Sequence, residues 1–268
     1  MDKFARQQIK SNPPYWNSRF SVDCRSLCYL RSAQFGVGEH AMQVSKTFHR
    51  IKSVLLSDQE KVVTIRLGVF RGVRTNAKPT NSVQIRLGLW ERETYRYIRR
   101  AAHDAAWVID IGAGGGELSI FFDLRTRAEP IIAVEAWDAR LLRRNIELNR
   151  SRRIEVLERY LGIETDRIPL DSLEVPRDQR GFIKLDADFA ELGILHSGER
   201  LLAESKPLLL VETHSAALER DCCAFLRPLG YSTTIIPNAW WRAIIPEQRP
   251  LDHNRWFWAE PTPSWHVS

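Results

Sequence analysis

The chain lacks any apolar run that approaches the roughly 20 residues needed to cross a bilayer. The opening segment Met1–Lys10 is polar and charged, without the apolar stretch that a secretory signal requires. Cysteine is scarce: the 4 residues are Cys24, Cys28, Cys222 and Cys223. The second pair is adjacent, and adjacent thiols rarely reach one tetrahedral ion without distortion. We therefore expect a cytoplasmic protein with free thiols and no structural metal site.

Long runs of basic residues are also missing. The formal net charge is +6, from 39 Lys and Arg against 33 Asp and Glu, but the basic residues are scattered along the chain. Proteins that follow a phosphate backbone gather such residues into a patch or stripe. The charge pattern therefore disfavours a nucleic acid as the partner and favours a small molecule, with nucleic-acid binding kept as an alternative.

The sequence divides into an N-terminal extension and one α/β domain. Residues 1–57 show weak periodicity, which a Pro-Pro pair interrupts, and no element is predicted there. The domain is predicted over residues 58–268, with a hairpin and a leading helix over 58–102 and a core over 103–268. A chain of 268 residues is long enough for one substantial domain with extensions.

Two stretches after the extension alternate in the manner of β-strands. They are Val62–Leu67 and Ser82–Leu87, and a link containing Gly, Asn and Pro separates them. This pattern predicts a β-hairpin that leads into a helix over Glu91–Ala102.

The rest of the chain alternates short apolar runs with helical stretches. Such alternation indicates βα units and a mostly parallel sheet with helices on both faces, which is a Rossmann-like α/β fold. Helices are predicted over Asp138–Arg150 and Leu218–Leu229, besides one after the first core strand. The predicted core strands are Trp107–Ile111, Pro130–Glu135, Ile154–Leu161, Gly181–Asp186, Pro207–Glu212, Tyr231–Ile236 and Arg255–Ala259.

A glycine-rich loop, Asp110–Glu117 with the sequence DIGAGGGE, follows the first core strand. Glycine lets a backbone turn sharply and approach a ligand closely, and the carboxyl end of this strand is where open α/β sheets bind ligands. A dinucleotide fingerprint would need glycine or alanine at position 117, where Glu117 would instead repel a pyrophosphate. An adenosyl cofactor without phosphate avoids this conflict, so a nicotinamide-dependent oxidoreductase is the weaker interpretation.

Residues around the loop match an adenosyl cofactor of the methionine type. Asp110, two residues before the first glycine, suits the ammonium and sulfonium charges that such a cofactor carries. Glu135 ends the second core strand, where a carboxylate is placed to accept hydrogen bonds from ribose hydroxyls. Trp137 is suited to stacking on an adenine face, although ordinary packing explains it equally well. The residues predicted to bind the cofactor are Asp110, Gly112, Gly114, Glu135, Trp137 and Asp186.

These motifs resemble those of the FkbM-type methyltransferases, over Leu87–Tyr231. The matching segments, in order, are Val108–Gly116, Ala133–Trp137 with Leu142–Asn149, Pro169–Leu173, Ile183–Glu191 and Leu210–His214. The resemblance implies a class I methyltransferase fold and S-adenosylmethionine as the cofactor. It also implies methyl transfer, commonly to a hydroxyl oxygen of a sugar or another small molecule.

The chain departs from the family pattern at three positions. Ala136 stands where proline is usual, Asp188 where glutamate is usual, and Phe189 where glycine is usual. If that glycine adopts a positive φ or lies under the substrate, Phe189 alters the acceptor pocket. The changes at Asp188 and Phe189 also support an alternative, in which the fold is a binding module without catalysis.

Catalytic candidates stand at the carboxyl ends of the fourth and fifth core strands. His214, with an ordinary pKa of about 6.5, is suited to take the acceptor's proton, although hydrogen bonding in a strand-end loop explains it as well. Asp186 and Asp188 are the other catalytic candidates, and helix-terminal acids are the plainer explanation of Asp188 and Glu191. Asp186, Asp188 and Glu212 offer oxygen ligands that suit magnesium, but their spacing does not indicate an ion and no metal ligand is assigned.

The C-terminal segment is rich in aromatic residues. Core packing in an edge strand is the favoured explanation for Trp256 and Trp258, whereas Trp240 and Trp241 follow a turn and are expected at the surface or the pocket rim.

Overall fold

The computed structural model describes residues 60–77, 84–239 and 253–262. The predicted extension, with Cys24 and Cys28, and the aromatic residues Trp240 and Trp241 lie outside the described residues, so the predictions about them stay predictions. Cys222 and Cys223 are free thiols, as expected. Across the described ranges, no helix is long and apolar enough to cross a membrane.

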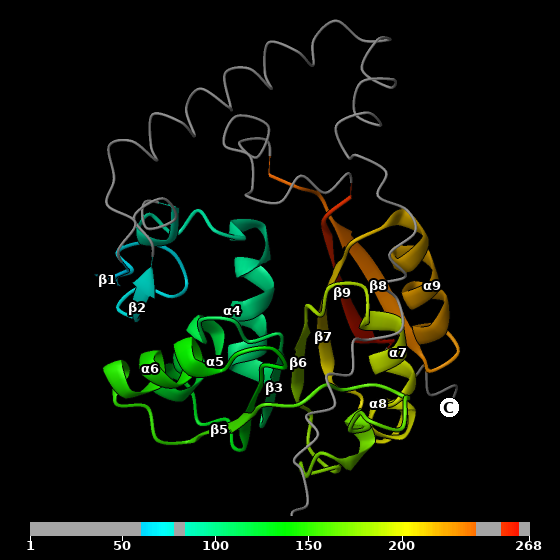
Figure 1. The fold of residues 1–268 in the computed structure, drawn as a ribbon. Helices are drawn as coiled ribbons and strands as arrows, with labels where there is room; N and C mark the ends of the chain where they lie inside the picture. The colour runs from blue at the N-terminus through cyan, green and yellow to red at the C-terminus, as the bar shows by residue number, and fades with distance from the viewer. Residues whose placement is uncertain (1–59, 78–83, 240–252, 263–268) are drawn as a thin grey trace, which may run out of the picture. The chain divides into compact units, whose positions relative to one another are not determined.

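The described strands of the core form one seven-stranded sheet (Figure 1). Their bounds are β3 Val108–Ile111, β4 Ile131–Val134, β5 Ile154–Leu157, β6 Phe182–Leu185, β7 Leu208–Thr213, β8 Tyr231–Ile236 and β9 Arg255–Pro261. The strand order is β5-β4-β3-β6-β7-β9-β8, in which β3 to β7 pair in parallel and β9 pairs antiparallel with β7 and β8. Without β9 this is the order of doubly wound Rossmann folds. The predicted Rossmann-like α/β fold, a mostly parallel sheet with helices on both faces, is confirmed.

Every residue of β3, β4, β6 and β7 is buried, because helices cover both faces of the sheet. On one face, strand residues such as Ile183 and Val211 pack against α7 (Glu191–His196), α8 (Glu199–Ser205) and α9 (Ala216–Leu226). On the other face, Phe182 and Leu210 pack against α4 (Tyr95–Asp104) and α5 (Glu117–Arg125).

Helix α6 (Arg140–Asn149) covers β4 through Leu142, which packs on Ala133. Short 3-10 helices at η2 (Arg92–Thr94) and η3 (Leu170–Ser172) complete the described elements of the core. The helices predicted before β3, after β4 and after β7 are therefore confirmed, with ends that differ by a few residues.

The strand β9 lies inside the sheet, between β7 and β8, so its predicted place at an edge is wrong. Trp256, Phe257 and Trp258 are buried on its two faces, which confirms core packing for both tryptophans. The Trp258 ring lies 5.1 Å from the Tyr97 ring of α4. The continuous apolar run Trp-Phe-Trp is the pattern of a strand covered on both faces, whereas β8 carries the exposed residues of an outer strand.

The predicted hairpin exists, but its second strand was wrongly placed. β1 (Lys61–Thr64) pairs antiparallel with β2 (Arg74–Ala77), while Gln84–Arg86 is helical and residues 78–83 lie outside the described part. The chain turns back earlier than predicted, within residues 65–73, where the amide of Gly72 donates to the carbonyl of Ile65. The sequence Arg-Thr-Asn-Ala has little intrinsic preference for a strand.

Side chains of α6 stabilise β2 from outside the hairpin. The amide of Arg74 donates to Oδ1 of Asn149 at 2.8 Å, and the amide of Asn76 donates to Oδ1 of Asn145 at 2.9 Å. Asn145 is fully buried, and its Nδ2 donates to Oγ1 of Thr75 at 3.0 Å and to the carbonyl of Gly115 at 2.8 Å. Asn145 therefore joins the hairpin to the glycine loop.

We expect Asn145→Ala to lower the free energy of unfolding by roughly 1–3 kcal/mol, because it leaves buried donors and acceptors without partners. Urea unfolding followed by circular dichroism measures the change. Glu147→Ala, on the exposed side of the same helix, is the control and should change stability by less than about 0.5 kcal/mol. Equal stability of the two variants would contradict the structural role of Asn145.

Candidate active site

The glycine loop runs from β3 to the start of α5 at the carboxyl end of the sheet. Gly112, Gly114 and Gly116 have positive φ values of 70°, 54° and 81°. A Cβ at Gly112 would lie 1.8 Å from the carbonyl oxygen of Asp186, so this glycine lets the loop meet the end of β6. A Cβ at Gly114 would meet nothing within 4 Å, which leaves the surface at Gly114 open to a ligand.

Glu135 follows β4 and ties two loops together. Its Oε2 accepts a hydrogen bond from the amide of Gly114 at 2.9 Å, and its Oε1 accepts one from the amide of Trp137 at 3.2 Å. The Trp137 side chain is 85% exposed, so ordinary core packing does not explain it. The predicted cofactor residues Gly114, Glu135 and Trp137 thus lie together at the point where the strand order reverses.

Asp110 lies beneath the loop and is 1% exposed. Its Oδ2 accepts a hydrogen bond from Ser119 at 2.6 Å, and its Oδ1 lies 4.0 Å from Nζ of Lys184. Burial raises the pKa of Asp110, against the opposing effect of Lys184. Lys184 also donates to the carbonyl of Gly112 at 2.7 Å, so this buried pair supports the loop from below.

Glu117 is the first residue of α5, and its carboxylate folds back over the loop. A Cβ on Gly115 would lie 2.6 Å from the Glu117 carboxylate, and Oγ1 of Thr75 donates to that carboxylate at 2.7 Å. Burial raises the pKa of this carboxyl, although the bond from Thr75 acts against the shift. The space at the helix N-terminus where a pyrophosphate would bind therefore holds a side chain of the chain itself.

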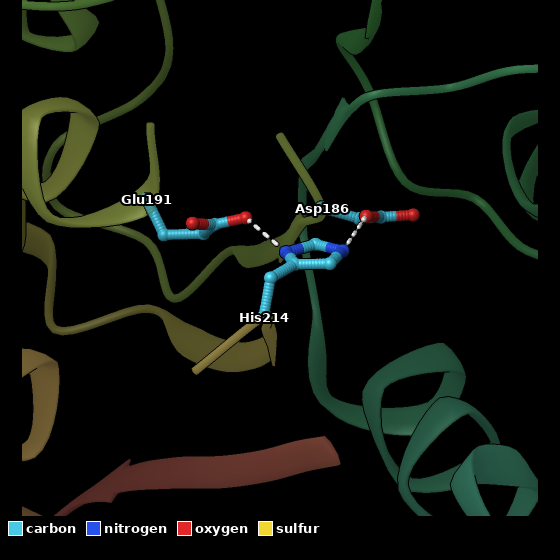
Figure 2. A group of neighbouring side chains, drawn as sticks. All are labelled: Asp186, Glu191 and His214. Carbon is cyan, nitrogen blue, oxygen red and sulfur yellow. Dashed lines mark hydrogen bonds and ion pairs between the residues drawn. The ribbon is translucent and has the colours of Figure 1, made fainter. Parts of the chain in front are cut away.

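His214 stands just after β7 and is 5% exposed (Figure 2). Figure 2 shows its ring between Glu191 and Asp186, with Nδ1 3.0 Å from Oε1 of Glu191 and Nε2 3.8 Å from Oδ1 of Asp186. Oδ1 of Asp188 lies 3.6 Å from Nε2, and Oε2 of Glu212 lies 3.8 Å from it. The three residues predicted to be catalytic therefore lie together, with Asp186 and Asp188 both facing Nε2 of His214.

Glu191 has a larger part in this site than its sequence position indicates. It begins α7, as expected of a helix-terminal acid, but it is fully buried. Its Oε1 accepts hydrogen bonds from the amides of Ala187 at 3.1 Å and Phe189 at 3.3 Å, besides the contact with His214. One oxygen thus positions both the turn after β6 and the imidazole. The resemblance places Glu191 in a motif, yet nothing in the sequence shows that it reaches His214.

Asp188 and Phe189 both adopt left-handed backbone conformations, with φ values of 43° and 78°. Position 189 therefore has a positive φ, which is one of the two conditions under which Phe189 is expected to alter the acceptor pocket. Phenylalanine is disfavoured in this region because its Cβ crowds the backbone, a penalty that glycine lacks.

The charges around Nε2 are coupled. Burial raises the pKa of Glu212, and the negative charge of Asp186 raises it further, so Glu212 is protonated at neutral pH. Burial opposes ionisation of Asp186, but Lys184 and the hydrogen bond with Glu212 hold the pKa of Asp186 below its usual range. The pKa values of these two carboxyls are therefore shifted in opposite directions, upward for Glu212 and downward for Asp186.

The pKa of His214 is raised. Burial alone would lower it, but the hydrogen bond with Glu191 and the charges of Glu191, Asp186 and Asp188 prevail. An imidazole whose Nδ1–H is held by a carboxylate keeps Nε2 free to accept a proton. The arrangement is therefore suited to proton transfer at Nε2.

A metal centre fits this arrangement less well. Single ligand atoms of Asp186, Glu191 and His214 lie within 4.8 Å of one another. However, the two ring nitrogens face different carboxylates, and Oε1 of Glu191 already accepts three hydrogen bonds. Hard cations such as Mg²⁺ also prefer oxygen ligands to imidazole.

We expect Glu191→Gln to lower the pKa of His214, because the substitution removes the buried charge that stabilises the imidazolium and preserves the side-chain shape. Titration of the imidazole ¹⁵N resonances by NMR measures this. Glu199→Gln, an exposed acid in the first turn of α8, is the control and should leave the titration unchanged. A His214 titration identical in both variants would contradict the pairing.

Comparison with family models gave no match, and neither did comparison with curated proteins. Among solved structures, precorrin-6y C5,15-methyltransferase from Geobacter metallireducens is 18% identical with a TM-score of 0.46, over 64% of this chain and 88% of that chain. TYW2 from M. jannaschii, in complex with AdoMet, is 13% identical with a TM-score of 0.47, over 77% and 88%.

Methyltransferase FkbM from Methylobacillus flagellatus is 21% identical with a TM-score of 0.45, over 58% of this chain. The chain spans 44% of the length of that protein. Similarity at these levels concerns the fold alone, and it assigns the chain to no family.

Proposed function

We propose that the chain is a methyltransferase that uses S-adenosylmethionine and methylates a hydroxyl oxygen of a sugar or another small molecule. The observation that carries this proposal is that two groups follow neighbouring strands at the carboxyl end of the sheet. One is the glycine loop with Glu135, and the other is the Glu191–His214 pair. Ligands of open α/β sheets bind at this edge.

The residues present fit an adenosyl cofactor that carries positive charge. In this proposal Glu135 binds the ribose hydroxyls, the exposed Trp137 stacks on adenine, and Asp186 pairs with the ammonium group. The open surface at Gly114 and the Glu117 carboxylate at the start of α5 favour a cofactor without phosphate. When bound, the cofactor supplies a methyl group made electrophilic by the sulfonium.

His214 is the proposed general base. Oε1 of Glu191 accepts a hydrogen bond from Nδ1–H, so the lone pair of Nε2 faces Asp186 and Asp188, where the acceptor hydroxyl would lie. Glu191 then stabilises the imidazolium that forms when Nε2 takes the hydroxyl proton. Glu191 acts through His214 and is a positioning residue.

The carboxylates around Nε2 support a small uncharged acceptor over a nucleic acid. Asp186 and Asp188 would repel a phosphate group held beside the reacting hydroxyl. The alternative of a binding module without catalysis rests on Asp188 and Phe189. In the left-handed turn that they form, the amide of Phe189 donates to Glu191, and Glu191 still pairs with His214. These two substitutions therefore leave the proposed base and its partner together, which favours catalysis over a binding module.

We expect S-adenosylmethionine to bind saturably and NAD not to bind. Glu135→Ala should weaken binding of S-adenosylmethionine roughly 10- to 100-fold, because hydrogen bonds to a charged group contribute about 1.5–3 kcal/mol. Isothermal titration calorimetry measures both. Glu204→Ala, an exposed acid on α8, is the control. Absence of heat and of a thermal shift with S-adenosylmethionine would refute the proposal.

We expect His214→Gln to lower turnover by roughly 10²–10⁴-fold, the usual contribution of a general base, with unchanged affinity for S-adenosylmethionine. Because the site raises the pKa of His214 and the base acts when neutral, the rate of the wild type should rise with pH above the ordinary histidine pKa of about 6.5.

The rate is measured by methyl transfer to an acceptor, which is first found by screening sugars and hydroxylated ring compounds with the wild type. His103→Gln, an exposed histidine of α4, is the control and should keep the wild-type rate and pH profile. A His214→Gln variant with the wild-type rate would exclude His214 as the base.

A further inference from the structure

The turn after β6 holds Phe189 in a conformation that packing does not explain. Its φ of 78° lies in the left-handed region, where glycine would be free of strain. Its side chain is 57% exposed, so little apolar surface is buried to offset the strained backbone. A large apolar residue at a strained and exposed position points to contact with a ligand.

The ring of Phe189 lies beside the proposed base. Its centroid is 5.3 Å from that of the His214 ring, and the two planes are inclined by 45°. The amide of Phe189 donates to Oε1 of Glu191, which also accepts from Nδ1 of His214. The same buried carboxylate therefore fixes the distance between the exposed ring and Nε2.

Asp188 adds a polar group to this surface. Its side chain is 64% exposed, and its Oδ1 lies 3.6 Å from Nε2 of His214. A flat apolar ring next to a carboxylate is suited to a ligand that has an apolar face and hydroxyls at its edge, because the face stacks and the hydroxyls donate. A ligand with a phosphate at the same place would face both Asp188 and Asp186.

We propose that Phe189 and Asp188 form the acceptor subsite, and that the acceptor is a neutral hydroxylated ring. Its flat face lies on Phe189, and a ring hydroxyl faces Nε2 of His214. Phenolic rings and pyranose sugars share this chemistry. The inference rests on the proposed methyltransferase function and deepens it, since it names the class of acceptor and a residue that selects it.

The first test uses melting temperatures to ask whether the Phe189 ring serves a ligand or stabilises the fold by packing. Phe189→Gly removes the backbone strain, so the melting temperature should rise by about 2–4 °C. Phe189→Leu keeps the strained backbone and the apolar character but loses the flat face, and it should melt close to the wild type. A fall of several degrees in Phe189→Gly would show that the ring stabilises the fold, and would overturn the proposal.

The second test observes the ring directly. Phe189 is labelled with 4-fluorophenylalanine, and its ¹⁹F resonance is assigned by its loss in Phe189→Leu. The labelled protein, with S-adenosylhomocysteine present, is titrated with 4-nitrocatechol, with methyl β-D-glucopyranoside, and with acyclic glycerol as the control. Phenyl phosphate serves as an anionic ring.

We expect a saturable shift of the Phe189 resonance with at least one of the two neutral rings, and a shift several-fold weaker with phenyl phosphate. A shift with the catechol indicates a phenolic acceptor, and a shift with the glucoside indicates a sugar. No shift with either ring, or an equal shift with glycerol, overturns the proposal. The label reports stacking whether or not a methyl group is transferred, so this failure is distinguishable from failure to bind S-adenosylmethionine.

Discussion

The geometry of the site depends on a single buried carboxylate oxygen, Oε1 of Glu191. It accepts hydrogen bonds from two amides of the turn after β6 and lies 3.0 Å from Nδ1 of His214, which follows β7. A buried charge is tolerated when several donors compensate the lost hydration. Here the donors come from the segments that follow two neighbouring strands, β6 and β7, so the interaction that compensates the charge also sets the distance between the turn and the imidazole. Removing the carboxylate would release both at once.

A second buried network supports the glycine loop in the same manner. Asn145 of α6 donates to Thr75 of β2 and to the carbonyl of Gly115, and Thr75 in turn donates to Glu117. The hairpin, α6 and the glycine loop are therefore joined by side-chain hydrogen bonds and not by backbone hydrogen bonds between strands. Each member has a partner inside the network, and such networks stabilise one arrangement because loss of any member leaves the others unsatisfied.

Local patterns in the sequence predicted the parts of this fold that depend on local physics. Continuous apolar runs identified β3, β4, β6 and β7, and the glycines identified the loop after β3. The errors concern long-range pairing. The partner of β1 and the inner place of β9 depend on which segments meet in space, and β2 has a weak strand sequence that α6 stabilises. The site shows the same difference between local and long-range features. The ends of the predicted strands located Asp186 and His214, whereas Glu191 and His214 are 23 residues apart and their contact depends on how the chain folds.

The local charge around Nε2 is opposite in sign to the net charge of the chain. The chain has a net charge of +6, yet the carboxylates of Asp186 and Asp188 dominate the surroundings of Nε2. Exposed charges are screened beyond about 8–10 Å at physiological ionic strength, so scattered surface Lys and Arg contribute little at Nε2. The pairing of Lys184 with Asp110 and Asp186 further confines the nearest buried cation to the space beneath the glycine loop. The surroundings of Nε2 are therefore acidic and aromatic on a basic protein, so under the proposed function this local surface, rather than the net charge, would select the acceptor.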